Sequence, residues 1–104
     1  MKRIRWTEPA RDDLRAIHKY IARDSEIYAQ RMVDRILRRV EMLETFPEIG
    51  GQVEELGRKD IRELIEGNYR IIYRFRNDIV EILTILHAAR RFPGHGRFED
   101  EPAS

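Results

Sequence analysis

Apolar and polar residues alternate in three successive runs in the second half of the chain. The runs lie at about 61–66, 69–76 and 79–87, and such alternation is typical of β-strands with one buried face. Gly67-Asn68 and Asn77-Asp78 separate the runs, and both pairs are two-residue turn signals. The sequence therefore predicts two successive β-hairpins.

Two-residue turns would fix the register of these strands, and with it the face on which each side chain lies. The expected cross-strand pairs are Glu66 with Tyr69, Arg76 with Ile79 and Arg74 with Glu81. One face then carries Leu64, Tyr69, Ile71, Tyr73, Phe75, Val80, Ile82 and Leu86. The opposite face, called here the second face, carries Ile61, Glu63, Ile65, Arg70, Ile72, Arg74, Arg76, Ile79, Glu81, Leu83, Ile85 and His87. We expect the first face to be buried and the second to present an apolar strip between charges.

The first half of the chain predicts one strand and two helices. Residues 2–6 alternate and predict a short strand, whereas apolar residues recur at helical spacing over about 8–23 and 26–45. Thr7 and Ser25 precede these stretches and are suitable N-cap residues. The short break between the helices predicts an antiparallel helical hairpin, and residues 47–59, which contain three glycines and a proline, predict a loop.

The order β-α-α-β-β-β predicts an α+β fold in which the helical hairpin packs on one face of a small, mostly antiparallel sheet. We expect a single domain over residues 1–93 and a flexible C-terminal tail over 94–104. No further element is predicted to cover the second face. Its apolar strip, centred on Ile72 and Leu83, is therefore expected to be a functional site or a partner interface. An aspartate at either position should then weaken partner binding more than it weakens folding.

Composition indicates where in the cell the protein is expected but not what activity it has. Lys and Arg number 20 and Asp and Glu 19, so the net charge of +1 gives no argument for or against nucleic acid. The absence of cysteine excludes disulfides and cysteine-ligated metal. The opening MKRIRWTEPARDD lacks the apolar core of a signal peptide, and no apolar run has membrane-spanning length. We therefore expect a cytoplasmic protein with no membrane partner.

Candidate chemistry is confined to the second face and the residues after it. The histidines are scattered, so no metal site and no cofactor are expected. A metal-independent ribonuclease could use Glu63 or His87 as the base and Arg70 to stabilise phosphate. The further basic residues of this set are Arg74, Arg90 and Arg91. The alternative, which the residues alone favour, is a partner-binding surface whose arginines meet acidic residues.

Four segments in order, IRWTEPARDDL, FPEIGG, IRELIEGNYRIIYR and VEILTILHAARRFP, resemble the RelE/ParE family of toxins from type II toxin–antitoxin systems. The resemblance covers roughly residues 1–93. It implies a growth-inhibiting toxin that is held inactive, in a hetero-oligomer, by a cognate antitoxin wrapped around its apolar and basic surface. It also implies that the antitoxin supplies any DNA recognition, so no direct sequence-specific DNA binding by this chain is expected.

The resemblance leaves two targets open. RelE-like members cut mRNA on the ribosome, whereas ParE-like members poison DNA gyrase and are not nucleases. Tyr69-Arg70 matches a pair found in cleaving members, but Arg62 and its neighbours stand where lysines are typical, and no tyrosine follows Tyr73. The ending HAARRFP resembles ParE-like chains, so a non-enzymatic gyrase inhibitor is favoured over an endoribonuclease. As an inhibitor, the chain would contact its target or antitoxin through Arg70, Ile72, Arg74, Leu83, Ile85, His87, Arg90 and Arg91. As a nuclease, it would use Arg70, Arg74, His87 and Glu63.

Overall fold

The computed structural model describes residues 2–89. The elements in chain order are β1 (Arg3–Trp6), α1 (Glu8–Ala22), α2 (Glu26–Glu41), the 3-10 helix η1 (Met42–Glu44), β2 (Gly51–Gln52), β3 (Ile61–Glu66), β4 (Tyr69–Arg76) and β5 (Ile79–His87). The predicted order is confirmed, with one addition, the two-residue strand β2 inside the expected loop. The second helix is shorter than expected because its last turn tightens into η1. No helix in the described part is both long and apolar enough to cross a bilayer.

Both helices begin at the predicted cap residues. The hydroxyl of Thr7 accepts a hydrogen bond from the Ala10 amide at 3.3 Å, and that of Ser25 accepts one from the Tyr28 amide at 3.1 Å. These bonds satisfy amides that have no partner within the helix. The Thr7 hydroxyl also donates to the Ile82 carbonyl of β5 at 2.7 Å, so the cap fixes the start of α1 to the sheet.

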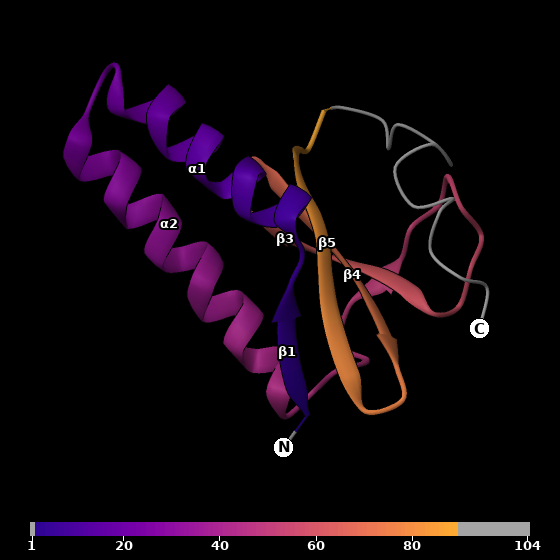
Figure 1. The fold of residues 1–104 in the computed structure, drawn as a ribbon. Helices are drawn as coiled ribbons and strands as arrows, with labels where there is room; N and C mark the ends of the chain where they lie inside the picture. The colour runs from indigo at the N-terminus through magenta and orange to yellow at the C-terminus, as the bar shows by residue number, and fades with distance from the viewer. Residues whose placement is uncertain (1, 90–104) are drawn as a thin grey trace.

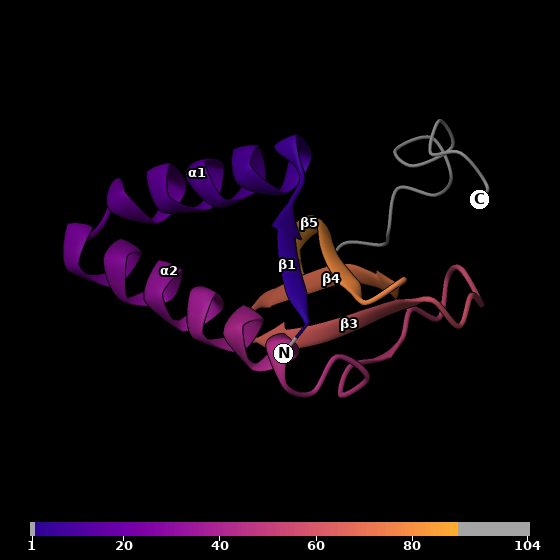
Figure 2. The ribbon, with the colours of Figure 1, turned by 60° about the horizontal axis from the view of Figure 1, so that its bottom comes forward.

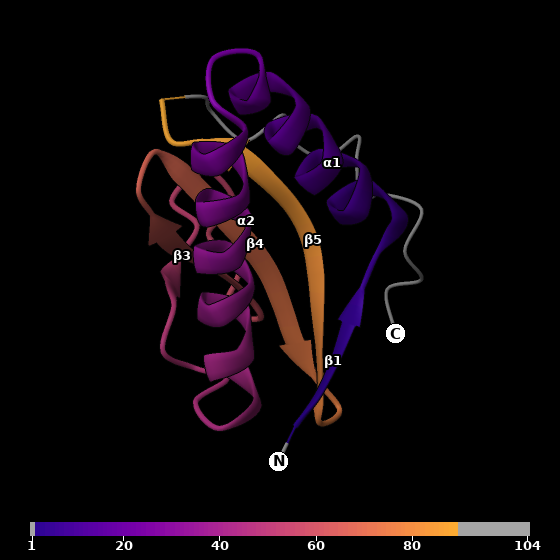
Figure 3. The same ribbon diagram turned by 90° about the vertical axis from the view of Figure 1, so that its left-hand side faces the viewer.

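The helical hairpin covers one face of a five-stranded sheet of order β1-β5-β4-β3-β2 (Figures 1 and 3). β1 pairs with β5 in parallel and the other neighbours are antiparallel. The three predicted pairs, Glu66 with Tyr69, Arg76 with Ile79 and Arg74 with Glu81, are confirmed. Gly67 provides a φ of 58° in the first turn, and Asn77 and Asp78 take φ values of 54° and 62° in the second. Such left-handed residues allow a two-residue turn to match the twist of the strands.

A β-bulge in β5 reverses the predicted faces near the end of that strand. Ile72 pairs with Thr84, but Tyr73 pairs with Ile82, so Leu83 is an extra residue. The expected alternation is therefore wrong beyond this point. Ile85 packs in the core under the helices, and Leu86 packs on the second face.

The second face is not open, which corrects the expectation from the sequence. Residues 53–57, called here the strap, lie across it. Val53 is fully buried and Leu56 is partly buried against a small apolar cluster formed by Ile61, Ile72, Leu83 and Leu86. Ile72 is 0% and Leu83 is 1% exposed, so the central strip forms a second, smaller core.

The loop before the strap is anchored by Tyr73, whose ring lies in the main core. Its hydroxyl donates to the Pro47 carbonyl at 2.8 Å and accepts from the Gly50 amide at 2.9 Å. A Cβ at position 50 would lie 2.7 Å from this hydroxyl oxygen, so the close approach requires glycine. Burial also raises the pKa of the Tyr73 hydroxyl, which therefore stays protonated and able to donate.

Candidate functional site

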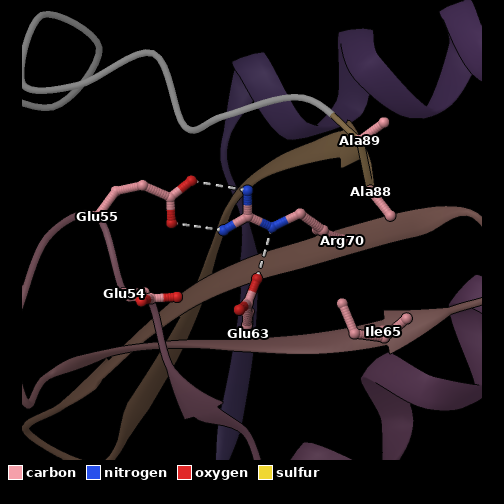
Figure 4. A pocket seen from close by; sticks show the side chains of 7 residues that line it. All are labelled: Glu54, Glu55, Glu63, Ile65, Arg70, Ala88 and Ala89. Atoms are coloured by element: carbon pink, nitrogen blue, oxygen red, sulfur yellow. Dashed lines mark hydrogen bonds and ion pairs between the residues drawn. The ribbon is translucent and has the colours of Figure 1, made fainter.

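Arg70 lies on the second face at the centre of a three-residue ion-pair cluster (Figure 4). Its Nε donates to Glu63 Oε1 at 2.6 Å, from the neighbouring strand β3. Its two terminal nitrogens, Nη1 and Nη2, donate to the two carboxylate oxygens of Glu55 at 2.9 and 3.0 Å. Glu55 belongs to the strap, and the Arg70 side chain is 8% exposed.

The two carboxylates stabilise the charged guanidinium more than burial opposes it. The hydrogen bond that Arg70 donates to Glu55 is the largest effect and the bond to Glu63 adds to it, so the pKa of Arg70 is raised. Paired in this way, Arg70 is not positioned to bind a phosphate while the strap is in place.

A hollow of about 490 Å³ opens beside Arg70. Its lining residues are Glu54, Glu55, Glu63, Ile65, Arg70, Ala88 and Ala89 (Figure 4). Three carboxylates and one guanidinium therefore line the hollow, together with two small alanines. In this arrangement the hollow is acidic.

Arg74 forms a second, separate ion pair on the same face. Its Nε and Nη2 both donate to Glu81 Oε1, at 3.0 and 2.7 Å, and Arg5 reaches the other oxygen of Glu81 at 3.1 Å. The Arg74 side chain is 1% exposed. A cation so enclosed holds β4 to β5 and has little access to a ligand.

His87 lies on the opposite side of the sheet from Arg70 and Glu63, which corrects the expectation that all three share one face. The reason is the bulge at Leu83, which shifts the alternation by one residue. The His87 ring is exposed and stacks edge-on against Tyr69, with ring centres 5.8 Å apart at 75°. Of the predicted nuclease set, the structure thus brings together Glu63 and Arg70 and separates His87 from them. Arg90 and Arg91 lie outside the described residues.

A groove between the helical hairpin and the end of the sheet is the larger concave feature, with a volume of about 900 Å³. Its apolar and aromatic lining consists mainly of Ile17, Tyr20, Ile21, Tyr28, Met32, Tyr69 and Ile85, and Arg35 and His87 add basic groups. The tip of the hairpin projects beyond the strands (Figure 2), and Tyr20 and Tyr28 there are each 66% exposed. Sequence reasoning missed this groove, although two large aromatic residues on either side of the Asp24-Ser25 break were its signal.

The described residues hold no cluster of three or more His, Cys, Asp or Glu side chains that could bind a metal ion.

The model of the ParE toxin family, described as the ParE toxin of the type II toxin–antitoxin system parDE, matches residues 4–92. The chain belongs to this family. Among curated relatives, Sinorhizobium fredii Y4kP, assigned as a toxin, is 41% identical over 88% of this chain and 94% of that protein. Caulobacter vibrioides toxin RelE2 is 37% identical over 86% of this chain and 99% of that protein. ParE and RelE names thus both occur among its relatives.

Solved structures of toxin–antitoxin systems share the fold of this ParE-family chain. A chain of the chromosomal ParDE system of P. aeruginosa matches with a TM-score of 0.69 at 24% identity, over 84% of this chain and 96% of that one. A chain of the RelBE2 toxin–antitoxin complex of Mycobacterium tuberculosis matches with a TM-score of 0.61 at 23% identity, over 83% and 96%. The expected α+β fold, with two helices on a mixed sheet, is confirmed by both.

Proposed function

We propose that this ParE-family toxin arrests growth by poisoning DNA gyrase in the cytoplasm and does not itself cleave RNA. The observation that carries the proposal is the separation of the candidate nuclease groups. His87 lies across the sheet from Arg70 and Glu63, so the described groups do not converge on one phosphate as acid–base catalysis requires. The match to the ParE model over residues 4–92 supports the same target.

The alternative is a ribosome-dependent mRNA endonuclease. The relative named toxin RelE2 favours it, as does the Tyr69-Arg70 pair beside a hollow on the second face. For this function Arg70 would have to exchange its two glutamates for RNA, and His87 would have to act from elsewhere on the surface.

We also propose that a cognate antitoxin neutralises the toxin by placing an apolar segment in the groove between the hairpin and the sheet. Large exposed aromatic side chains that gather at one apolar groove mark a surface that a partner covers, and Tyr20 and Tyr28 are such side chains. Of the contact residues expected from the sequence, His87 and Ile85 line this groove. Ile72 and Leu83 are buried under the strap and Arg70 is paired with its Glu55, so these three are contact residues only for a partner that displaces the strap. Arg74 is enclosed separately, in its ion pair with Glu81.

The experiment that tests the target is expression of the toxin alone, with DNA breakage and mRNA cleavage measured in the same cells. We expect growth arrest with broken DNA and intact message, and we expect purified toxin to block supercoiling by gyrase. Co-expression of the antitoxin is the matched control and should restore growth. Arrest with cleaved message and intact DNA would instead establish the endonuclease, and normal growth would contradict both functions.

A further inference from the structure

We propose that the outer side of α1 is a second interaction surface, which binds the phosphate backbone of duplex DNA. Its cations, called here the basic stripe, are Arg11, Arg15, Lys19 and Arg23. The choice of DNA rests on the proposed function, because duplex DNA is the substrate of gyrase. Contacts to the phosphate backbone carry no sequence information, so the proposal agrees with the expectation that this chain does not recognise a particular DNA sequence.

The basic stripe has one cation every four residues, from the first turn of α1 to Arg23, which caps its C-terminal end. Four residues advance an α-helix by about 6 Å, so the stripe spans about 18 Å. One strand of duplex DNA carries a phosphate for about every 3.4 Å of its axis. The phosphates are therefore closer together than the cations, so each cation can pair with a phosphate of its own when the DNA backbone lies along the helix.

All four cations of the basic stripe are accessible to a ligand. The side chains of Arg11 and Arg15 are 52% and 68% exposed, and each pairs with an exposed carboxylate three residues before it on α1. Such surface pairs contribute little to stability, so a phosphate can replace either carboxylate at small cost. Lys19 and Arg23 are also exposed, and they form no ion pair within the part of the chain that the structure describes.

The C-terminal part of the basic stripe attracts an anion more strongly than the N-terminal part. Residues 14–23 include Arg15, Lys19 and Arg23 but no aspartate or glutamate. The next carboxylates, those of Asp24 and Glu26, follow in the turn and at the start of α2. Because cations without neighbouring carboxylates produce a stronger local field, we expect Lys19 and Arg23 to supply most of the affinity for DNA.

The basic stripe faces away from the groove between the hairpin and the sheet. Arg15, Lys19 and Arg23 each lie two residues from Ile17 or Ile21, both of which line that groove. Residues two positions apart are separated by about 200° around a helix, so they do not share a side. The stripe therefore stays accessible to DNA while a partner occupies the groove.

The test measures binding of a short fluorescein-labelled DNA duplex of random sequence to the purified toxin, by fluorescence anisotropy over a series of salt concentrations. For the wild type, the logarithm of the affinity should fall against the logarithm of the salt concentration with a slope of about −3 to −4, since each phosphate contact contributes about −0.9. Lys19→Gln/Arg23→Gln should raise the Kd about tenfold and make the slope shallower by about 2.

Arg31→Gln/Arg38→Gln is the matched control, because it removes the same charge from exposed positions of α2. It should raise the Kd less than about threefold and leave the slope unchanged. Glutamine is a good helix former, so both variants should fold, which circular dichroism verifies. Equal losses of affinity in the two variants, or a wild-type slope near zero, would overturn the proposal. Tighter binding of duplex RNA than of duplex DNA would overturn the assignment to DNA.

The binding assay contains no gyrase, so its result is separate from a supercoiling assay with the same proteins. A toxin that binds DNA through the basic stripe but leaves supercoiling by gyrase unaffected would overturn the proposed function and not the DNA contact. A toxin that blocks supercoiling but binds DNA equally well with and without Lys19 and Arg23 would overturn the DNA contact alone.

Discussion

At the scale of single residues, exposure separates side chains that look alike in the sequence. Ile65 and Ile72 both lie on the second face, yet Ile65 is 50% exposed and Ile72 is fully buried under the strap. The arginines also differ from the expectation that they contact a partner. Arg70 forms ion pairs with Glu55 and Glu63, and Arg74 forms one with Glu81, all within the same chain. The charged side chains of the second face therefore stabilise the fold instead of forming a binding surface.

This difference reverses the effect expected for an aspartate at position 72. Ile72→Asp should destabilise the fold by at least about 3 kcal/mol, because it buries a charge without a partner. Ile65→Asp, the matched control on the same face, should stay within about 0.5 kcal/mol of wild type. Chemical denaturation measures both values. Equal stability of the two variants would mean that the strap does not seal the second face.

At the scale of elements, the bulge at Leu83 is the feature on which the positions of the last strand depend. The Asp13 carboxylate of α1 reaches this point and accepts hydrogen bonds from the Thr84 hydroxyl and, at 3.0 Å, from the Ile85 amide. Because the bulge leaves a strand irregular, a side-chain acceptor here replaces part of the missing ladder. α1 thereby fixes the register that directs Ile85 and His87 towards the groove.

Asp13→Asn should cost about 1–2 kcal/mol of folding free energy, since one carboxylate oxygen accepts both bonds and the neutral amide oxygen that replaces it accepts them more weakly. Asp12→Asn is the matched control, because Asp12 is exposed and pairs with Arg15 one turn away on the same helix. It should change the stability by less than about 0.5 kcal/mol. Thermal melting of the two variants under one condition tests the difference, and a Tm for Asp13→Asn that equals that of Asp12→Asn would contradict this role.

The same elements mark how far the sequence predicts the structure. Helix caps, hairpin turns and the pair Arg74–Glu81 follow from local signals, and all were predicted. The bulge was not, because an extra residue such as Leu83 leaves no mark in an alternation that is apolar on both faces over Ile82–Leu86. The sequence also did not predict that the strap covers the second face. Val53 and Leu56 lie in a loop, where apolar residues show no helical or strand periodicity. The bulge also explains why the candidate nuclease residues do not lie on one face. That prediction assumed regular alternation along the whole of β5.

At the scale of the whole molecule, the helical hairpin and the sheet form two arms, and the tip of the hairpin projects away from the strands (Figure 2). An apolar groove lies between the hairpin and the end of the sheet. The main core fills the joint of the arms, whereas the aromatic residues at the hairpin tip stay exposed. The main core is therefore packed while the hairpin tip beside the groove stays exposed, which suits a surface that a partner occupies reversibly.

Tyr28→Ala should weaken antitoxin binding about tenfold, because exposed aromatic anchors supply much of the energy of such interfaces. Phe46→Ala is the control. Phe46 is also exposed, at 57%, but lies past the far end of α2 and outside the groove, so its removal should change the Kd less than about twofold. Titration calorimetry with the purified antitoxin compares them. If Phe46→Ala were the more damaging change, the antitoxin would bind the opposite end of the hairpin.

The strand order has a consequence for synthesis of the toxin. β5 is the last strand in the described chain, yet it lies between β1 and β4. Lys2, just before β1, forms an ion pair with Asp78, just before β5, across a sequence separation of 76 residues. Closing so long a segment is slow compared with forming local hairpins, and it cannot begin before β5 exists. In a nascent chain, β1 therefore has no strand to pair with, and α1 has no β5 to pack against, until β5 has been synthesised. A stop codon before β5 therefore yields a chain that cannot form the central part of the sheet. A single nonsense mutation in this region should be enough to abolish toxicity.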